Sequence, residues 1–326
     1  MSTALRSVMN EPITSVVVPV YKNEGSIDQL LDRIAQLSNV VNGRVEAVFV
    51  VDGSPDRSLE ALHAKLPNQA FDAKIILLSR NFGAFSAIRA GLRVSSGETT
   101  VVMAADLQEP LSLVTKLLDI VQRNDAEVAV GVRQSRKDGF FSRVLSAVFW
   151  KLFKKISSLE LPRGGVDIFA LSRSARETVN TFQESSTSLI GLIYWMGFRR
   201  QEVPYHREER KVGKSSWSLQ KRINYAKDSI TAFSEFPLTM FLWSGLFGAL
   251  ISLILAAVGA FQYAFTSSHQ SQRELTSIGL LFVASYLMSG LGLLGTYLWR
   301  VADNVRNRPD SITWKTWDIP AQKLAE

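Results

Sequence analysis

Two long apolar stretches near the C-terminus constrain the fold of this chain more than any other feature. Residues Leu238–Phe265 and Ser277–Trp299 contain no Asp, Glu, Lys or Arg. Each is long enough to cross a bilayer core of about 30 Å as a helix. The short polar segment between them, TSSHQSQREL, leaves room only for a tight connection. The pattern predicts a hairpin of two transmembrane helices, in which several glycines favour close packing: Gly245, Gly248, Gly290, Gly292 and Gly295.

The basic residues around the hairpin predict its orientation. Lysines and arginines gather before the first stretch and after the second, whereas the connecting loop carries only Arg273, offset by Glu274. Cytoplasmic loops carry the excess of positive charge in membrane proteins. The flanking residues on which this rests are Lys211, Lys214, Lys221, Arg222, Lys227, Arg300, Arg306 and Arg308. We therefore expect a multi-pass protein of the cell inner (plasma) membrane with both termini in the cytoplasm, and the N-terminal segment lacks the apolar core of a signal peptide.

Composition narrows the chemistry. The 326 residues include no cysteine, which excludes disulfides and thiolate metal sites, and the three histidines are scattered. The formal net charge is +7. A basic chain can bind nucleic acid, anionic lipid or a phosphate-rich substrate. With a membrane hairpin in the same chain, we expect lipid and phosphate partners and no nucleic acid.

The first 132 residues alternate between strand-like and helix-like segments. The expected strands are short, β-branched and apolar on both faces, and they cover residues 13–21, 45–51, 74–78, 99–105 and 127–132. Amphipathic runs lie between them at residues 25–37, 58–66, 85–94 and 111–123. This alternation predicts a doubly wound α/β domain with a mostly parallel sheet. Ligands bind such sheets at the carboxyl ends of the strands.

Polar clusters follow four successive strands at those ends. They read PVYKNE from Pro19, DGSPD from Asp52, SRNFG from Ser79 and ADLQEP from Ala105. A single cluster such as DGSPD is typical of an ordinary turn with an Asp helix cap. Four clusters in order on neighbouring strand ends indicate a binding site.

Two basic amphipathic segments separate this domain from the hairpin, at residues 139–157 and 217–235. The first has Phe, Leu, Val and Trp on one side and Arg143, Lys151, Lys154 and Lys155 on the other. It is compatible with a surface helix packed on the sheet or with a helix lying in a membrane interface.

Taken together, these motifs resemble glycosyltransferase family 2, and within it the polyisoprenyl-phosphate glycosyltransferases, which include dolichyl-phosphate mannose synthase and undecaprenyl-phosphate sugar transferases. The likeness runs from about residue 13 to residue 310. The segments that carry it are PVYKNE, DGSPDRS, RNFGAFSAIRAGL, ADLQEP, GVRQSR, ALSR, REERKVGKSSW and NRP. It implies a GT-A fold with a Rossmann-like sheet, followed by interface helices and the hairpin. The implied layout is a nucleotide-sugar core at 1–138, an acceptor-side region at 139–236, the membrane helices at 237–300 and a tail at 301–326.

The resemblance also implies roles for individual residues. The donor would be a nucleotide diphosphate sugar, bound by Pro19, Tyr21, Glu24, Asp52, Asn81, Gly83 and Asp106. Asp106 and Gln108 would hold Mg²⁺ or Mn²⁺ on the diphosphate, since these ions favour oxygen ligands. The acceptor would be a polyprenyl phosphate, and the phosphates of donor and acceptor would be met by Arg133, Arg136, Arg143, Arg207, Arg210, Lys214 and Ser215. Lys137 is placed to assist them. Asp106 and Asp167 are the implied catalytic residues, with Asp167 positioning acceptor or sugar or acting as a general base.

The chain departs from the family pattern at several of these motifs. The first acid of the metal-binding pair is Ala104, and the first acid of the usual Asp-Asp-Gly-Ser is Val51. Gly164, Phe169 and Ser216 stand where relatives carry an acid, an arginine and a lysine. With Asp106 as the remaining acid, we expect weaker metal affinity and an ion bound chiefly through the oxygens of the nucleotide.

The expected activity is inverting transfer of a hexose, with UDP-glucose as the first donor to test, to undecaprenyl phosphate at the cytoplasmic membrane face. Two alternatives keep the donor site. One changes the acceptor to another membrane lipid or lipid-linked glycan. The other is a degenerate scaffold that binds nucleotide sugar without catalysis. No residue identifies the sugar, and the resemblance alone implies a homo-oligomer, for which a tetramer is one form.

Overall fold

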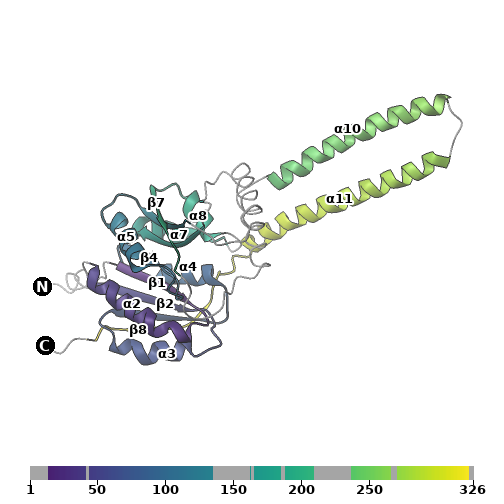
Figure 1. The fold of residues 1–326 in the computed structure, drawn as a ribbon. Helices are drawn as coiled ribbons and strands as arrows, with labels where there is room; N and C mark the ends of the chain where they lie inside the picture. Colours follow the sequence, from purple (N-terminus) through teal and green to yellow (C-terminus); the bar gives the residue numbers. More distant parts are fainter. Residues whose placement is uncertain are drawn as a thin grey trace.

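The computed structural model describes residues 14–41, 44–134, 162, 165–184, 188–208, 236–265 and 270–322. In this part of the chain the strands are β1 (Thr14–Val20), β2 (Val45–Val51), β3 (Asp72–Leu78), β4 (Thr99–Val102), β5 (Val128–Arg133), β6 (Val166–Ser172), β7 (Arg200–Tyr205) and β8 (Thr313–Ile319). The α-helices are α2 (Ile27–Val40), α3 (Ser58–Lys65), α4 (Ala84–Val94), α5 (Leu111–Gln122), α7 (Arg173–Thr181), α8 (Leu189–Trp195), α10 (Phe236–Phe265) and α11 (Gln270–Val305). Figure 1 shows a sheet with helices on both faces and a long hairpin formed by α10 and α11.

The strands form one mixed sheet in the order β7-β5-β6-β4-β1-β2-β3-β8. Strand β1 pairs in parallel with β2 and β4, and β2 pairs in parallel with β3. Strand β6 runs antiparallel between β4 and β5, and β8 runs antiparallel along β3. The GT-A architecture expected from the sequence is confirmed, with the parallel strands at its centre.

The alternation of side chains along β1 explains the two helical layers. Val16, Val18 and Val20 point to one face and pack with α2, α3 and α5, whereas Val17 points to the face covered by α4 and α7. Every one of these valines is fully buried. Since successive side chains on a strand point to opposite faces, a strand covered by helices on both sides must be apolar throughout. This is why the sequence shows runs of valine and isoleucine here.

The expected strands and helices of the first 132 residues are confirmed, with one informative difference in β4. The strand was expected to reach Ala105, but it ends at Val102. The amide of Met103 still donates to the carbonyl of Val17, after which the chain leaves the ladder. Leu107 then adopts a left-handed backbone with φ of 59°, which is uncommon for a residue with a branched side chain. The segment that carries Asp106 is therefore a loop rather than the tip of the strand.

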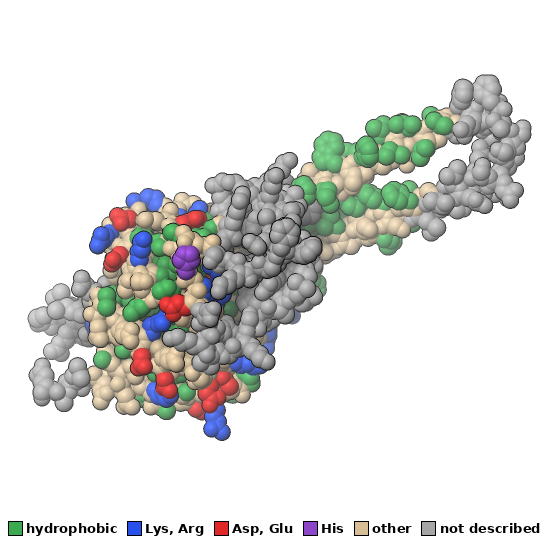
Figure 2. Space-filling view, in the orientation of Figure 1, with side chains coloured by type: hydrophobic (Ala, Val, Ile, Leu, Met, Phe, Trp, Pro, Cys, Tyr) green, Lys and Arg blue, Asp and Glu red, His purple; other side chains and the backbone are tan. Residues whose placement is uncertain are grey.

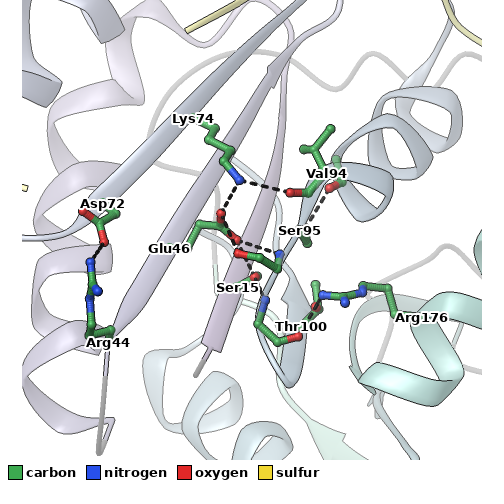
Figure 3. Close-up of polar contacts among 12 residues, drawn as sticks. Ser15, Arg44, Glu46, Asp72, Lys74, Val94, Ser95, Thr100 and Arg176 are labelled. Atoms are coloured by element: carbon green, nitrogen blue, oxygen red, sulfur yellow. Dashed lines mark hydrogen bonds and ion pairs between the residues drawn. The ribbon is translucent and has the colours of Figure 1, made fainter. Parts of the chain in front are cut away.

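The amino ends of the central strands are joined by a buried polar network around Glu46 (Figure 3). Its carboxylate forms an ion pair of 2.7 Å with Lys74 of β3 and accepts hydrogen bonds from the hydroxyl of Ser15 and the amide of Ser96. Glu46 is 3% exposed. Burial alone would raise the pKa of Glu46, but the hydrogen bonds from Lys74, Ser96 and Ser15 outweigh it, and the pKa falls below its usual value.

Helices α10 and α11 form the hairpin, and both are apolar over a length that can cross a membrane. The candidate membrane-spanning segments are Leu238–Leu255 and Phe282–Val305, with mean hydropathies of 2.1 and 1.3. Almost none of this surface is covered by the rest of the molecule, and Figure 2 shows hydrophobic side chains along the described parts of both helices. The rings of Phe241 and Tyr286 stack at 4.5 Å between the helices.

The chain returns to the sheet after α11. Residues 301–326 were expected to form a tail, and within them Thr313–Ile319 is strand β8, paired with β3. Just before it, Asp310 is buried against α4, where it forms ion pairs with Arg89 at 3.0 Å and Arg93 at 2.7 Å. The segment that follows the hairpin is thus attached to the α/β domain at two places.

Candidate active site

The loops that carry the candidate residues meet at one edge of the sheet. Strands β1, β2, β3 and β4 run in the same direction, so the segments after them emerge together. Because β6 is antiparallel to β4 and β5, its first residues lie at this same edge, beside the ends of β5 and β7. Asp167 at the start of a strand can therefore face Arg133 at the end of another. The edge divides into three groups of contacts.

The first group joins the loops after β1, β2 and β3, and Asp56 connects the first two of these loops. Its carboxylate accepts hydrogen bonds from the Ser54 hydroxyl at 2.6 Å, the Ser58 hydroxyl at 2.7 Å and the Glu24 amide at 3.0 Å. The Lys22 amide donates in turn to the Ser54 hydroxyl. Burial would raise the pKa of Asp56, but the hydrogen bonds from Ser54 and Ser58 outweigh it and lower the pKa. These bonds hold the two loops in fixed positions.

Asp52 connects the loop after β2 to the loop after β3. Its carboxylate accepts hydrogen bonds from the backbone amides of Phe82 at 2.7 Å and Gly83 at 2.9 Å. The Asn81 side chain donates a hydrogen bond to the backbone carbonyl of Asp52. Asp52 is 2% exposed, and burial raises the pKa of its carboxyl, against the effect of these two amides and Arg80. Both carboxylate oxygens are thus engaged with the backbone.

Gly53 allows the β2 and β3 loops to approach each other. A Cβ at this position would lie 2.4 Å from the carbonyl carbon of Arg80 and 2.5 Å from the amide nitrogen of Asn81. Its φ of +55° also lies in the left-handed region that glycine adopts without strain. No other residue can occupy this point without moving backbone atoms.

The second group surrounds Asp106 in the loop after β4. Arg207, from the segment after β7, places its guanidinium 3.5 Å from the Asp106 carboxylate. The two loops are also joined through their backbones, since the Glu208 amide donates to the Gln108 carbonyl at 2.9 Å and the Gln108 side chain donates to the Glu208 carbonyl at 3.1 Å. The Nε of Arg207 is buried without a hydrogen-bond partner among the described residues. This nitrogen is thus a donor whose hydrogen-bonding capacity is unused.

Glu109 lies beneath this group and is fully buried. Neither carboxyl oxygen of Glu109 has a hydrogen-bond partner among the described residues. Burial raises the pKa of Glu109 to about 8, with the charges of Asp106 and Asp167 adding to the effect and Arg207 opposing it. Its backbone carbonyl accepts a hydrogen bond from Arg33.

The third group consists of Arg133, Asp167 and Tyr205, from β5, β6 and β7. The Arg133 guanidinium donates to one oxygen of Asp167, with its Nε at 3.1 Å, and the Tyr205 hydroxyl donates to the same oxygen at 2.9 Å. Burial and the neighbouring carboxylates raise the pKa of the Tyr205 hydroxyl, which stays protonated as a donor. Asp167 is thus held by residues of two other strands, and it in turn holds the Arg133 guanidinium.

The structure brings together three sets of the predicted residues: Asp106, Gln108 and Arg207; Arg133 and Asp167; and Asp52, Asn81 and Gly83. Pro19 lies in β1 beside Val50 of β2, and the Glu24 carboxylate accepts the Arg57 amide at 3.3 Å. Tyr21 remains 36% exposed at this edge. Arg136, Lys137, Arg143, Arg210, Lys214 and Ser215 lie outside the described residues, as do the two basic amphipathic segments.

Sequence reasoning missed Asp56, Glu109 and Tyr205. Asp56 belongs to DGSPD, and its place between Ser54 and Ser58 is a local signal of a hydrogen-bonded turn. Glu109 stands next to Gln108 in ADLQEP, so the motif included it without assigning it a role. Tyr205 gave no signal, because only the pairing of β7 with β5 brings it to Asp167.

The side chains present fit a divalent cation only in part. Asp106 and Gln108 offer one carboxylate and one amide oxygen, and no group of three or more His, Asp or Glu residues in the described part of the chain can hold a metal ion. Mg²⁺ is commonly bound by one or two carboxylates with the rest of its shell from substrate phosphates and water. The donor set therefore fits an ion that arrives with a diphosphate, and it does not fit an ion held by the protein alone.

Comparisons with known proteins show which family the chain belongs to. The model of glycosyl transferase family 2 matches residues 15–179. A bactoprenol glucosyl transferase from a prophage of Shigella flexneri is 30% identical, over 93% of this chain and 97% of that protein. An undecaprenyl-phosphate 4-deoxy-4-formamido-L-arabinose transferase of Yersinia pestis is 31% identical, over 92% of this chain and 93% of that protein.

Among solved structures, a mannosyltransferase from Pyrobaculum calidifontis in complex with GDP-mannose and Mn²⁺ is 19% identical and superposes with a TM-score of 0.49, covering 91% of this chain and 87% of that one. The family model covers half of the chain, and it includes β1 to β6 and the loops after the first four strands. The relatives match over nearly their whole length. The chain therefore belongs to glycosyltransferase family 2 and is a glycosyltransferase.

Proposed function

We propose that this protein transfers a hexose, with inversion at the anomeric carbon, from a nucleotide diphosphate sugar to undecaprenyl phosphate at the cytoplasmic face of the membrane. The observation that carries the proposal is the placement of two cations, Arg207 and Arg133, at the same edge of the sheet, each held by a carboxylate. The reaction has two phosphate-bearing substrates, and this edge offers a separate cation to each.

The donor half of the proposal rests on Asp106 and Arg207. Arginine binds phosphate through charge-assisted hydrogen bonds, and the Arg207 guanidinium lies 3.5 Å from the Asp106 carboxylate at this edge. The loops fixed by Asp52 and Asp56 would form the walls around the base and ribose, next to Tyr21 and Glu24. UDP-glucose is the first donor to test, since a glucosyl transferase is among the relatives.

The acceptor half rests on Arg133 and Asp167. A phosphate monoester has a second pKa near 6, so an acceptor phosphate is largely a dianion at neutral pH and needs little help from a base. Asp167 accepts two hydrogen bonds from Arg133 and one from Tyr205, all on the same oxygen. We assign it the role of positioning Arg133 against the acceptor phosphate. Attack opposite the leaving diphosphate inverts the anomeric centre.

Membrane insertion of the hairpin places the acceptor within reach. Helices α10 and α11 have the length and apolarity of membrane spans, and two relatives are named for lipid-phosphate acceptors. With both termini cytoplasmic, the strand-end edge would meet the inner leaflet, where the phosphate of a polyprenyl lipid lies. Homo-oligomer formation through these helices remains part of the proposal.

The proposed metal would be held by Asp106 and Gln108 and would offset charge on the leaving diphosphate. Because the described residues offer one carboxylate, Asp106, and one amide oxygen, Gln108, we expect the affinity for Mg²⁺ or Mn²⁺ to depend on bound nucleotide. Titration of Mn²⁺ by electron paramagnetic resonance with and without UDP would measure this. Tight binding without UDP, or full turnover after exhaustive chelation, would contradict the assignment.

Incubation of membranes that contain the protein with radiolabelled UDP-sugars and undecaprenyl phosphate tests the function. We expect label in a chloroform-soluble product that mild acid releases. Label in a product that resists mild acid would indicate another lipid or lipid-linked glycan as acceptor. If no nucleotide sugar serves as donor but the protein still binds UDP, the result would favour a non-catalytic scaffold. This is the main alternative function, because Ala104 replaces the first acid of the metal-binding pair.

A further inference from the structure

A cavity of about 450 Å³ lies beside the chain that leaves α11. Arg89 and Arg93 of α4, Asn180 of α7, and Arg308 and Asp310 line it. We refer to it as the arginine cavity. Figure 1 shows α4 close to this part of the chain, at the junction between the hairpin and the catalytic domain. None of these residues belongs to the three groups of contacts in the candidate active site.

The charges of the arginine cavity are not balanced within the described part of the chain. Three arginines and one carboxylate, Asp310, line the cavity, and the charge of Glu184 also acts on Arg89. Arg93 binds Asp310 through both terminal nitrogens, at 2.7 and 2.8 Å, and Arg89 reaches it at 3.0 Å. Arg308 makes no hydrogen bond or ion pair with another described residue. Burial lowers the pKa of Arg89, with the charge of Arg93 adding to the effect and those of Asp310 and Glu184 opposing it.

The cavity also contains an unused acceptor. Asn180 donates to the carbonyl of Leu92 at 3.2 Å, whereas its buried Oδ1 has no hydrogen-bond partner among the described residues. A buried amide oxygen without a partner is costly, and it would be satisfied by a ligand hydroxyl. The lining of the cavity thus includes a cation suited to phosphate and a residue whose buried amide oxygen has unused hydrogen-bonding capacity.

The position of Arg308 indicates where such a ligand would come from. It lies nine residues after Trp299, where the uncharged stretch ends, and three residues after Val305, the last residue of α11. Three residues span at most about 10 Å of chain. Residues 300–305 add about 9 Å of helix, so if α11 crosses the membrane as proposed, Arg308 lies on the cytoplasmic side, within about 20 Å of the end of the uncharged stretch. Basic pockets beside transmembrane helices on the cytoplasmic side bind anionic headgroups.

We propose that the arginine cavity binds the phosphate of an anionic phospholipid whose headgroup also carries a hydroxyl, as phosphatidylglycerol does, with Arg308 contacting the phosphate. The proposal rests on the membrane insertion in the proposed function but not on sugar transfer. This site would hold a lipid that is not a substrate and would fix the catalytic domain against the leaflet.

Lipid binding to the full-length protein in detergent, followed by native mass spectrometry, tests the proposal. Short-chain phosphatidylglycerol, short-chain phosphatidylcholine and inorganic phosphate are the three probes. We expect phosphatidylglycerol to bind, and R308Q to weaken it by about tenfold, since one charge-assisted contact to phosphate is lost. R306Q is the matched control, because it removes the same charge two residues away and outside the cavity lining. It should change the affinity by less than about threefold.

Each other outcome overturns a defined part of the proposal. Equal losses in R308Q and R306Q would indicate general attraction to negative charge and no built site. If phosphatidylcholine bound as tightly as phosphatidylglycerol, neither the net charge nor the hydroxyl of the headgroup would matter for binding. If inorganic phosphate bound as tightly as phosphatidylglycerol, the cavity would be a site for a soluble anion. Circular dichroism of both variants checks folding. The sugar-transfer assay in phosphatidylcholine nanodiscs fails or succeeds independently of these measurements, so the two proposals are tested separately.

Discussion

Asp106 and Arg207 come from loops that are 101 positions apart in sequence, and their contact defines the donor side of the candidate site. The family pattern has two acids where this chain has Ala104 and Asp106. Because Asp106 is the only acid of this pair, the Arg207 guanidinium 3.5 Å away would neutralise a larger part of the negative charge of a bound diphosphate. The site therefore depends on arginine more than a two-acid site would.

Substitution of Arg207 tests this dependence. We expect R207Q to lower kcat for sugar transfer by about 100-fold or more, since loss of one donor to developing negative charge has an effect of that order. The measurement is initial rate at saturating UDP-sugar. R123Q serves as the control, because Arg123 is exposed at the far end of α5. A rate for R207Q within threefold of the wild type would exclude Arg207 from the transferring site.

Glu46 provides a test of stability rather than of catalysis. We expect E46Q to lower the free energy of unfolding by about 2 kcal/mol at pH 7, because a buried carboxylate is lost while Lys74 and two other donors remain. Denaturant unfolding monitored by circular dichroism measures this. E60Q, on the exposed surface of α3, should have little effect.

The pH dependence of the same variant has a definite sign. The pKa of Glu46 is lower in the folded state, so its contribution is complete above the unfolded-state pKa of about 4.3 and is lost as pH falls through the folded-state pKa. The difference between wild type and E46Q should therefore narrow below pH 4.3. A constant difference down to pH 3 would contradict the lowered pKa.

At the scale of elements, the hairpin depends on the small size of particular glycines. A Cβ on Gly290 would lie 2.4 Å from the ring of Phe241 across the helix pair, whereas a Cβ on Gly292 would meet nothing within 4 Å. Small residues let transmembrane helices approach closely. The five glycines that the sequence pointed to as packing positions are thus not equivalent.

Two alanine variants separate these positions. We expect G290A to destabilise the hairpin by about 1–3 kcal/mol through overpacking, whereas G292A should be neutral or slightly stabilising because alanine favours the helix. Unfolding of the purified protein in mixed micelles by SDS titration provides the comparison. Equal behaviour of the two variants would mean that α10 and α11 do not pack through Gly290 and Phe241.

At the scale of the whole molecule, the absence of cysteine makes topology directly measurable. A single cysteine in place of Ser268, between α10 and α11, should react with a membrane-impermeant maleimide in intact cells if the hairpin crosses the membrane. A cysteine in place of Ser174, on the exposed surface of α7, should react only after the cells are opened. Labelling of both, or of Ser174→Cys alone, in intact cells would contradict the proposed orientation.

The sequence by itself determined the elements that depend on local pattern. The β-branched runs of β1 to β5 and the amphipathic runs between them follow from side-chain periodicity, and α10 and α11 follow from uninterrupted apolar length. The clusters after the first four strands followed from the same reasoning, because the carboxyl ends of parallel strands meet at one edge. The sequence analysis predicted none of β6, β7 and β8, which lie after the alternating pattern of the first 132 residues.

Tertiary structure alone decided which side chains meet. The antiparallel insertion of β6 brings Asp167 to Arg133 and Tyr205, and the pairing of the loops after β4 and β7 brings Arg207 to Asp106. The return of the chain along β3 as β8 places Asp310 on α4 and closes the arginine cavity. The physical reason is that these contacts join residues from about 30 to more than 200 positions apart. Periodicity predicts which residues share one helix or strand, whereas contacts between elements depend on how the strands are ordered and directed in the sheet.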